Sequence, residues 1–385
     1  MNPARIHRRT PQKRLAIFLI GGIGGGIALQ GVPAITAITE SLANTFEVSV
    51  YSLMRPDHEF TPKGYTLYSP PRWLAKRAVR KLRWSWLACQ FLAEHWKRPY
   101  DVLLSFWGYP MGLFVVLLGH LVRRPSVITI LGAEAASVPS IGYGHMRLPT
   151  TRRLVIATCA RATEVVVLSS HQRAALRRYG LRRNDLRVVP FGIDQRLFPW
   201  KPASRQPPLK ILHVANLTEV KDQQTLVRGF ALVRKQTVAK LRIVGPDHLN
   251  GKLQSLVQDL DVQDDVEFVG PVPYTAIPSH YEWADMFVLT SLSEGQCTSL
   301  AEAAMSGVLQ VSTPVGCIID QGEEATVVVR PGDPIDLAEK IVTIASDRAA
   351  WDSKVARARV WAESHDLQWT IAQFTDVINQ AVSWN

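Results

Sequence analysis

Short apolar runs alternate with segments of helical spacing along most of the chain, and such runs between turn residues are typical of buried β-strands. The strands predicted in this way are residues 15–20, 47–53, 102–107, 126–131 and 164–168 in the first half, and residues 209–215, 241–244, 266–269, 308–312 and 327–330 in the second. Strands that alternate with helices form parallel sheets, and right-handed crossovers place helices on both faces. The pattern therefore predicts an α/β protein with doubly wound sheets.

The alternation stops and restarts at a proline-rich stretch, residues 199–208, which indicates a linker between two domains. The first predicted domain covers residues 1–198 and begins with a basic tail at residues 1–12. The second covers residues 209–365, and a further helical pattern follows it. With 385 residues, of which 47% are hydrophobic, the chain can form two sizeable cores.

The most apolar window, residues 102–122, is long enough to suggest a membrane span. Pro110 and several polar residues interrupt it, so we expect a buried strand, a turn and a helix instead. A basic start before the first apolar run also suggests a signal peptide, but the glycines of residues 21–26 break the run. We interpret that segment as a strand and a glycine loop, where the backbone can approach a ligand closely.

The cysteines give no sign of a metal site. The four cysteines are scattered, with no C-x-x-C pair and no histidine at metal-ligand spacing: Cys89, Cys159, Cys297 and Cys317. This usage favours reduced thiols in a cytoplasmic protein and gives no indication of structural zinc.

Charge is distributed unevenly within the total of +11. Residues 1–200 contain 28 Lys and Arg against 10 Asp and Glu, a net charge of +18, whereas residues 201–385 contain 16 against 23, a net charge of −7. The first half therefore suits an anionic partner. Recognisable nucleic-acid motifs are missing from the sequence, so we expect an anionic membrane surface rather than nucleic acid. The densest basic segment, residues 72–86, has the pattern of an interfacial helix, and the alternative is a domain helix with a solvated basic face.

Candidate chemistry lies in residues 285–307, which have the pattern of a strand, a polar turn and a helix. A phosphate could bind the N–H groups that begin such a helix, here near Gly295 to Thr298. Glu294 and Glu302 bracket the turn, and because carboxylates repel phosphate, we expect each to accept hydrogen bonds from sugar hydroxyls. The alternatives are a capping box, Ser299 with Glu302, and a solvated loop charge at Glu294.

Glu294, seven intervening residues and Glu302 resemble the E-x7-E signature of retaining glycosyltransferases of family 4. The resemblance implies the GT-B fold, in which two Rossmann-like domains face a cleft and the C-terminal helix, here in residues 366–385, packs back on the first domain. It also implies that Glu302 binds the ribose of a nucleotide-sugar donor and that Glu294 contacts the donor sugar. The turn amides that would hold the diphosphate belong to Gly295, Gln296, Cys297 and Thr298.

Other segments resemble the family less closely. The glycine loop implies contact with the donor diphosphate from across the cleft through Gly24, Gly25 and Gly26, and the loop that contains Val272 lies where the family holds the nucleobase. Residues 188–194 resemble a family turn, with Phe191 in the usual place of asparagine.

Two further positions depart from the family pattern. The family binds the donor phosphates with an Arg and a Lys five residues apart. Lys221 matches the Lys, but Asn216 replaces the Arg. One point charge therefore remains, and the bidentate hydrogen bonding of a guanidinium is lost. Leu131 stands where members often carry a histidine at the reaction centre. The adjacent Gly132 and Glu134 are the acceptor-side candidates.

The resemblance implies a retaining, metal-independent transfer of a sugar from a UDP- or GDP-linked donor to a hydroxyl acceptor, lipid-linked acceptors included, in polysaccharide or glycolipid synthesis at the inner face of a membrane. Glu294 and Lys221 are the catalytic candidates, and no cofactor is implied. One alternative is a nucleotide-sugar epimerase, for which Glu134 is the suggestive group. The other is a non-catalytic scaffold, because Asn216 and Leu131 weaken the motif.

Overall fold

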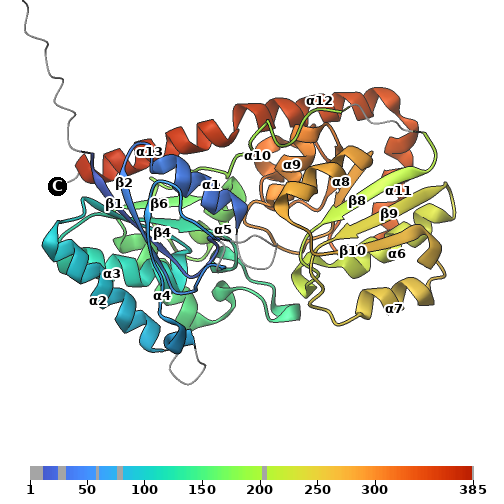
Figure 1. Ribbon diagram of the computed structural model, residues 1–385. Coiled ribbons are helices and arrows are strands. Elements are labelled where there is room, and N and C mark those ends of the chain that lie inside the picture. The colour runs from blue at the N-terminus through green and yellow to red at the C-terminus, as the bar shows by residue number, and fades with distance from the viewer. Residues whose placement is uncertain (1–11, 25–31, 58–59, 76–80, 202–205, 384–385) are drawn as a thin grey trace, which may run out of the picture.

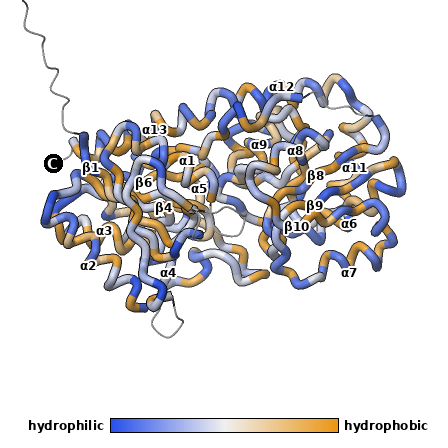
Figure 2. Tube along the Cα trace, in the orientation of Figure 1, coloured by the Kyte–Doolittle hydropathy of each residue, from blue (hydrophilic) through white to orange (hydrophobic). Residues whose placement is uncertain are grey.

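The computed structural model describes residues 12–24, 32–57, 60–75, 81–201 and 206–383. The chain forms two parallel sheets, each with helices on both faces, side by side in Figure 1. This confirms the predicted α/β fold class. Figure 2 shows hydrophobic residues concentrated along the strands of both sheets, as expected for strands that are covered on both faces.

The first sheet has the order β3-β2-β1-β4-β5-β6-β7, and every neighbouring pair is parallel. Its strands are β1 (Arg14–Leu19), β2 (Glu47–Ser52), β3 (Thr66–Tyr68), β4 (Val102–Phe106), β5 (Ser126–Ile130), β6 (Glu164–Val167) and β7 (Arg187–Val188). In β1, Leu15, Ile17 and Leu19 pack on one face, whereas Ala16 and Phe18 pack on the other. This alternation follows from the two-residue period of a strand.

Two helical layers cover this sheet. The helices of the first domain are α1 (Pro33–Leu42), α2 (Leu82–Lys97), α3 (Leu113–Val122), α4 (Pro149–Arg161) and α5 (Ser170–Arg178). Helix α1 packs on one face together with α13 (Leu367–Ser383), and α2, α3 and α4 cover the opposite face (Figure 1).

Two segments of the first domain can be compared with their predictions. Residues 102–122 form β4, a π-helical turn (Gly108–Gly112) and α3, as the interruption at Pro110 predicts. Among the described residues, none of the helices is long and apolar enough to cross a membrane. The single helix predicted over residues 72–86 is wrong, because residues 72–75 form a 3₁₀ turn and α2 begins at Leu82; residues 76–80 lie outside the described part.

The second sheet has the order β10-β9-β8-β11-β12-β13 and is also parallel. Its strands are β8 (Leu209–Val214), β9 (Ala239–Val244), β10 (Val266–Gly270), β11 (Met286–Leu289), β12 (Leu309–Ser312) and β13 (Val327–Val328). Its helices are α6 (Gln223–Arg234), α7 (Lys252–Asp259), α8 (Ile277–Trp283), α9 (Thr298–Ser306), α10 (Ile318–Gln321), α11 (Pro334–Ser346) and α12 (Arg348–Ser364).

The chain passes from the first domain to the second after β7, and it returns to the first domain at the end of α12. Figure 1 shows α12 over the second sheet and α13 continuing over the first. Gly192, on the outward passage, lies so close to the return passage that a Cβ atom there would be 2.1 Å from the Asp366 backbone. Thr370 ties the passages together, because its hydroxyl accepts a hydrogen bond from the Gly192 N–H (2.8 Å) and donates one to the Pro190 carbonyl (2.7 Å).

Candidate active site

A cleft of about 700 Å³ lies between the carboxyl ends of the two sheets. Its first-domain wall comes from the loops after β4 and β5, and its second-domain wall from the loop after β8 and the turn between β11 and α9. In parallel α/β sheets this edge collects ligands, because loops and helix N-termini converge there. The predicted site residues that line this cleft are Gly132, Glu134, Asn216, Lys221, Glu294, Gly295, Gln296, Cys297 and Thr298.

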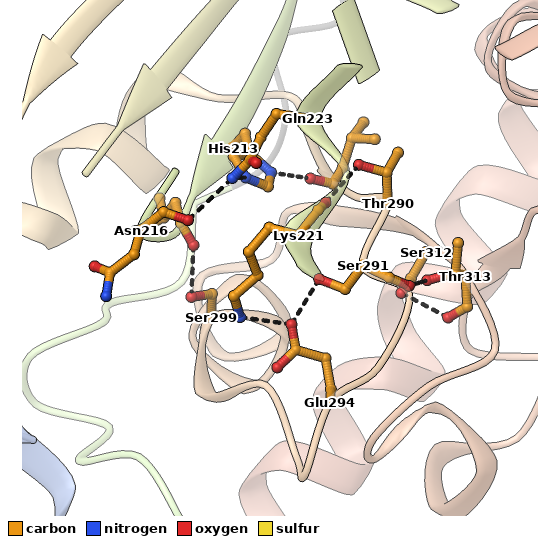
Figure 3. A network of polar contacts seen from close by, with 12 residues as sticks. His213, Asn216, Lys221, Gln223, Thr290, Ser291, Glu294, Ser299, Ser312 and Thr313 are labelled. Atoms are coloured by element: carbon orange, nitrogen blue, oxygen red, sulfur yellow. Dashed lines mark hydrogen bonds and ion pairs between the residues drawn. The ribbon is translucent and has the colours of Figure 1, made fainter. Parts of the chain in front are cut away.

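Lys221 and Glu294 form an ion pair on the cleft wall, with 2.6 Å between Nζ and Oε1 (Figure 3). The Ser291 hydroxyl donates to the same carboxylate oxygen at 2.6 Å. Burial by itself lowers the pKa of Lys221, but the nearby Glu294 carboxylate outweighs it, so the pKa lies above its usual value and the lysine stays charged. The family resemblance implies a separate donor contact for each residue, whereas the structure joins the two side chains in an ion pair. Lys221 is the only Lys or Arg among the described residues that line the cleft.

The loop that carries Lys221 is held by buried polar groups. The Thr290 hydroxyl bonds to the Lys221 carbonyl at 3.1 Å. Behind it, His213 Nδ1 bonds to the Val288 carbonyl (2.8 Å), and the Gln223 side chain bonds to His213 Nε2 (3.2 Å) and to the Asn216 carbonyl (3.0 Å) (Figure 3). Burial lowers the pKa of His213 to about 4, so this histidine is neutral and donates from Nδ1. A polar residue inside the apolar run of residues 209–214 is the sequence signal for this network.

The turn at Gly295 is packed against the first domain. The Ser169 hydroxyl donates to the Gly295 carbonyl at 2.6 Å. A Cβ atom on Gly295 would lie 1.8 Å from the Leu131 carbonyl oxygen, so only glycine allows this approach. The backbone of Leu131, where the family pattern often has a histidine, therefore contacts the turn that carries Glu294.

The side chain of Gln296 does not point into the cleft, so only its backbone amide, as predicted for this turn, remains a candidate donor contact. The residue is only 3% exposed, and its side-chain amide bonds to the backbone of Phe191 in the first domain at both ends. Oε1 accepts from the Phe191 N–H at 2.7 Å, and Nε2 donates to the Phe191 carbonyl at 2.8 Å. Gln296 thus fixes one domain to the other beside the site.

We expect a Gln296→Ala variant to be less stable than the wild type by about 2 to 3 kcal/mol, because it leaves a buried N–H and a buried carbonyl of Phe191 unpaired. Urea denaturation measures the difference. The exposed Gln263 is a matched control, and its replacement by alanine should change stability by less than about 0.5 kcal/mol. Equal unfolding midpoints for the two variants would contradict the role of Gln296.

Helix α9 begins at Thr298, and its first two residues line the cleft. Its N-cap, Cys297, has a φ of 69°, a conformation that is uncommon for a residue with a side chain. The first N–H groups of a helix have no partner inside the helix and carry partial positive charge, so they suit an anion. Burial raises the pKa of the Cys297 thiol to about 12, so it stays protonated and is a poor nucleophile.

Glu302 lies in an adjoining pocket of about 220 Å³. Tyr274 and Tyr281 donate to its two carboxylate oxygens at 3.2 and 3.0 Å. Burial raises the pKa of Glu302 to about 7, and the two tyrosine bonds oppose the shift. The capping-box alternative is wrong, because Cys297 is the N-cap of α9 and the Ser299 hydroxyl donates to the Val214 carbonyl at 2.9 Å.

The pocket around Glu302 is apolar and is closed by both domains. Val272, Tyr274 and Ile277 line it from the second domain, and Val32 and Pro33, at the start of α1, line it from the first. Val214, Thr298 and Ser299 line both this pocket and the cleft, so the two spaces adjoin at the start of α9.

Glu134 is placed differently from the expectation of a carboxylate that handles water. It is 2% exposed, and its two oxygens accept hydrogen bonds from the backbone N–H groups of Gly108 and Gly132, both at 2.9 Å. A carboxylate held in this way braces two loops of the cleft wall. Nothing here favours it as the base of an epimerase.

The glycine loop contributes less than predicted in the described part. Gly24 packs against Pro56 and Phe60, with space too small for a Cβ atom, and lines neither the cleft nor the adjoining pocket. Its predicted contact with the donor is not supported by this position. Gly25 and Gly26 lie outside the described residues.

Sequence reasoning missed several cleft residues, among them Tyr143 and His145. Burial raises the pKa of Tyr143, and its hydroxyl is close enough to Lys221 and Glu294 for their charges to act on it. The His145 ring packs edge-on against Tyr109, with 5.3 Å between ring centroids. Both belong to an irregular loop, where the sequence has no periodic signal.

Comparisons with known proteins agree with this geometry. The family description "Glycosyltransferase Family 4" matches residues 34–197, and "Glycosyl transferases group 1" matches residues 208–347. One of the subunits of phosphatidylinositol N-acetylglucosaminyltransferase from Arabidopsis thaliana is 30% identical over 43% of this chain and 37% of its own length. The putative colanic acid glycosyltransferase WcaL of Escherichia coli is 28% identical over 55% of this chain and 53% of its own length. The chain thus spans about half or less of these relatives.

Solved structures show the same fold at low sequence identity. Sucrose-phosphate synthase of Thermosynechococcus elongatus is 19% identical and has a TM-score of 0.80 over 97% of this chain and 100% of its own. HepE of Anabaena, in complex with UDP-glucose, is 17% identical and has a TM-score of 0.74 over 95% and 99%. The fold, the two family matches and the spacing of Glu294 and Glu302 agree, and the chain belongs to glycosyltransferase family 4, with the GT-B fold.

Proposed function

We propose that this protein transfers a sugar from a nucleotide-diphosphate donor to a hydroxyl acceptor, with retained configuration and without a metal ion. The observation that carries the proposal is the continuity of three environments. The pocket of Glu302 meets the first turn of α9, which in turn meets the ion pair of Lys221 and Glu294. A nucleoside, a diphosphate and a sugar would occupy them in that order.

Each environment suits one part of such a donor. The apolar pocket takes the nucleobase, and Glu302 accepts hydrogen bonds from the ribose hydroxyls. The amides at Thr298 and Ser299 take the diphosphate, because they lie where the two spaces adjoin. Figure 3 shows the ammonium of Lys221 and the hydroxyl of Ser291 pointing toward the carboxylate of Glu294. Lys221 and Glu294 both line the cleft, where charge and acceptor oxygens can address the leaving group and the sugar.

The reaction that we propose needs positioning more than a protein base. The acceptor oxygen bonds to the anomeric carbon as the bond from that carbon to the diphosphate oxygen breaks, and the acceptor proton passes to the departing diphosphate on the same face. Negative charge on the diphosphate is greatest in the transition state, and Lys221 and the α9 amides are already in place to stabilise it. Asn216 supplies no second cation. We therefore expect the loss of Lys221 to lower the rate more than the loss of one cation would where an Arg and a Lys share the diphosphate.

The names of the relatives support a glycoconjugate pathway without fixing the substrate. They include colanic acid glycosyltransferases and an alpha-monoglucosyldiacylglycerol synthase of Streptococcus pneumoniae, which is 23% identical over 54% of this chain. The HepE structure is a complex with UDP-glucose. We therefore propose a UDP- or GDP-linked donor and a hydroxyl acceptor of polysaccharide or glycolipid synthesis, a lipid-linked acceptor included.

The test is calorimetry with UDP, GDP, UDP-glucose and GDP-mannose, followed by NMR of the product formed with a hydroxyl acceptor. We expect one donor class to bind and the new glycosidic bond to keep the donor's anomeric configuration. Failure of both UDP and GDP to bind would contradict the proposal and favour a scaffold. An epimerised sugar nucleotide, formed without any acceptor, would contradict it in favour of an epimerase.

A further inference from the structure

The helical layer of α2, α3 and α4 leaves large apolar side chains exposed on the outside of the first domain. On α3, Val115 and Leu118 pack inward, whereas Leu117 and Leu121 are 61% and 66% exposed. On α2, Leu82 and Trp96 are 51% and 75% exposed. Trp84 and Phe114 join the two helices, with ring centroids 5.2 Å apart.

Charged residues are missing from the middle of this surface. Between Arg83 and Glu94 helix α2 has no charged residue, and α3 has none along its whole length. We call this surface the α2–α3 face; its exposed members are Leu82, Ser85, Cys89, Ala93, Trp96, Leu117 and Leu121. A surface helix normally carries charges on its outer side, so a face of this kind indicates an interaction site.

A basic pocket of about 550 Å³ adjoins this face, at the amino end of β5. His120, one turn from Leu117 on α3, lines it together with Arg123, Arg124 and Arg161. Among the described residues, Arg123, Arg124 and Arg161 form no ion pair. The carboxylate in the pocket wall, Asp185, is already paired with Arg183 at 2.6 Å. Three arginines are thus available to an anion.

The surrounding sequence lacks free acidic groups. Residues 60–163 contain 15 Lys and Arg but only three acidic residues, a net charge of +12. Glu94 is paired with Lys97, the Asp101 carboxylate accepts from the Arg14 N–H, and Glu134 is buried. Apolar residues beside an unopposed basic field match the surface of an anionic bilayer, where acyl chains and phosphates lie a few ångströms apart.

We propose that the α2–α3 face docks on an anionic lipid bilayer, with Leu117 and Leu121 at the acyl boundary and lipid phosphates in the pocket of Arg124 and Arg161. Neither signal is strong alone, and two together give stable reversible binding. Helix α3 connects this surface to the cleft, because Pro110, just before its start, lines the cleft and His120, near its end, lines the basic pocket. Ten residues of helix span about 15 Å, so the cleft would lie close to the bilayer.

The test is flotation of the full chain with vesicles of phosphatidylcholine alone and with vesicles that also contain phosphatidylglycerol. We expect binding to the anionic vesicles that weakens as salt rises, since exposed charges are screened beyond about 8 Å at physiological ionic strength. Failure to bind anionic vesicles, or equal binding to both kinds, would contradict the proposal. Donor binding plays no part in this measurement, so its outcome is separate from that of the proposed function.

Variants locate the contact. Leu117→Ser with Leu121→Ser should weaken partition at least about tenfold, from the loss of two inserted leucines. Arg124→Gln with Arg161→Gln should weaken it about fivefold per charge on anionic vesicles alone. The matched control is Ile335→Ser with Val360→Ser, whose side chains are 59% and 67% exposed in the second domain and should not matter. Thermal melting checks that all three variants are folded.

Two outcomes would overturn the assignment of this face. One is a control variant that binds vesicles as weakly as the leucine variant, because the loss would then be nonspecific. The other is a wild-type dimer in light scattering that becomes monomeric in the leucine variant. The α2–α3 face would then be covered by a second copy of the chain and not by lipid.

Discussion

A Lys221→Ala variant is expected to lose at least about a hundredfold in kcat, with a smaller change in the KM for the donor. The reason is that charge on the leaving diphosphate is greatest in the transition state, so a cation in contact with it lowers the barrier more than it tightens ground-state binding. Lys221 is the only Lys or Arg among the described cleft residues, so no neighbour can substitute for it. Steady-state kinetics with the identified donor measures both constants.

Lys221→Ala removes both a cation of the cleft and the partner of Glu294, so it is expected to lower both kcat and stability. A second substitution separates the effect on kcat from the effect on stability. Lys221→Ala also leaves the Glu294 carboxylate, whose side chain is 11% exposed, without its cation, so the melting temperature should fall. Adding Glu294→Gln removes that unpaired charge and should restore the melting temperature without restoring kcat. Lys221→Arg should recover only part of kcat, because a planar guanidinium does not replace a compact ammonium. If Lys221→Ala has near-normal kcat, the lysine serves structure alone.

A Glu302→Gln variant is expected to bind the donor at least about tenfold more weakly, because a charge-assisted hydrogen bond to a ribose hydroxyl contributes about 1.5 to 3 kcal/mol. Wild-type affinity should also depend on pH. The pKa of Glu302 is raised to about 7, so the carboxylate forms only as pH rises through that value, and affinity should rise with it. The glutamine variant should show no such dependence.

The stability of the fold should change in the opposite direction. The folded pKa of Glu302 lies above its ordinary value of 4.5, so the folded state holds the proton more tightly than the unfolded state. This contribution is fully present below the unfolded pKa and is lost as pH rises through about 7, at most about 3 kcal/mol. Near pH 8 the glutamine variant should therefore be the more stable protein, whereas at low pH the two should converge.

Calorimetry and thermal melting across the pH range measure these effects. The ligand should be the sugar-linked nucleotide and not free UDP or GDP, whose terminal phosphate titrates near pH 6 and would obscure Glu302. A flat affinity profile in the wild type, or a glutamine variant with the same profile, would remove Glu302 from the ribose site.

The features that the sequence predicts well are local. The strand runs and the division of residues 102–122 at Pro110 follow from periodicity and from the geometry of proline. The strand before Glu294, the turn and the helix that contains Glu302 follow one another within a short stretch of the chain. They therefore leave a recognisable pattern in the sequence. The single helix over residues 72–86 was mispredicted, because the spacing of basic and apolar residues shows how a helix would be amphipathic but not where it begins.

The features that the sequence does not reveal depend on contacts between distant segments. Lys221 and Glu294 are 73 residues apart, and Gln296 and Phe191 are 105 apart. A single sequence says which residues are charged or polar but not which of them meet. Sequence alone therefore does not show that two backbone N–H groups donate to the Glu134 carboxylate. Nor does it show that the Gln296 side chain bonds to the backbone of Phe191.

Helix α13 also determines when the first domain can be completed during synthesis. Phe374, Val377 and Ile378 belong to the same buried cluster as Leu15 and Ile17 of β1. The ribosome makes these residues only after the whole second sheet has emerged, although domains generally fold in order from the N-terminus. Until then, the face of the first sheet that α1 and α13 share is covered by α1 alone. The nascent chain would therefore present an apolar surface to chaperones for as long as the second domain takes to be translated.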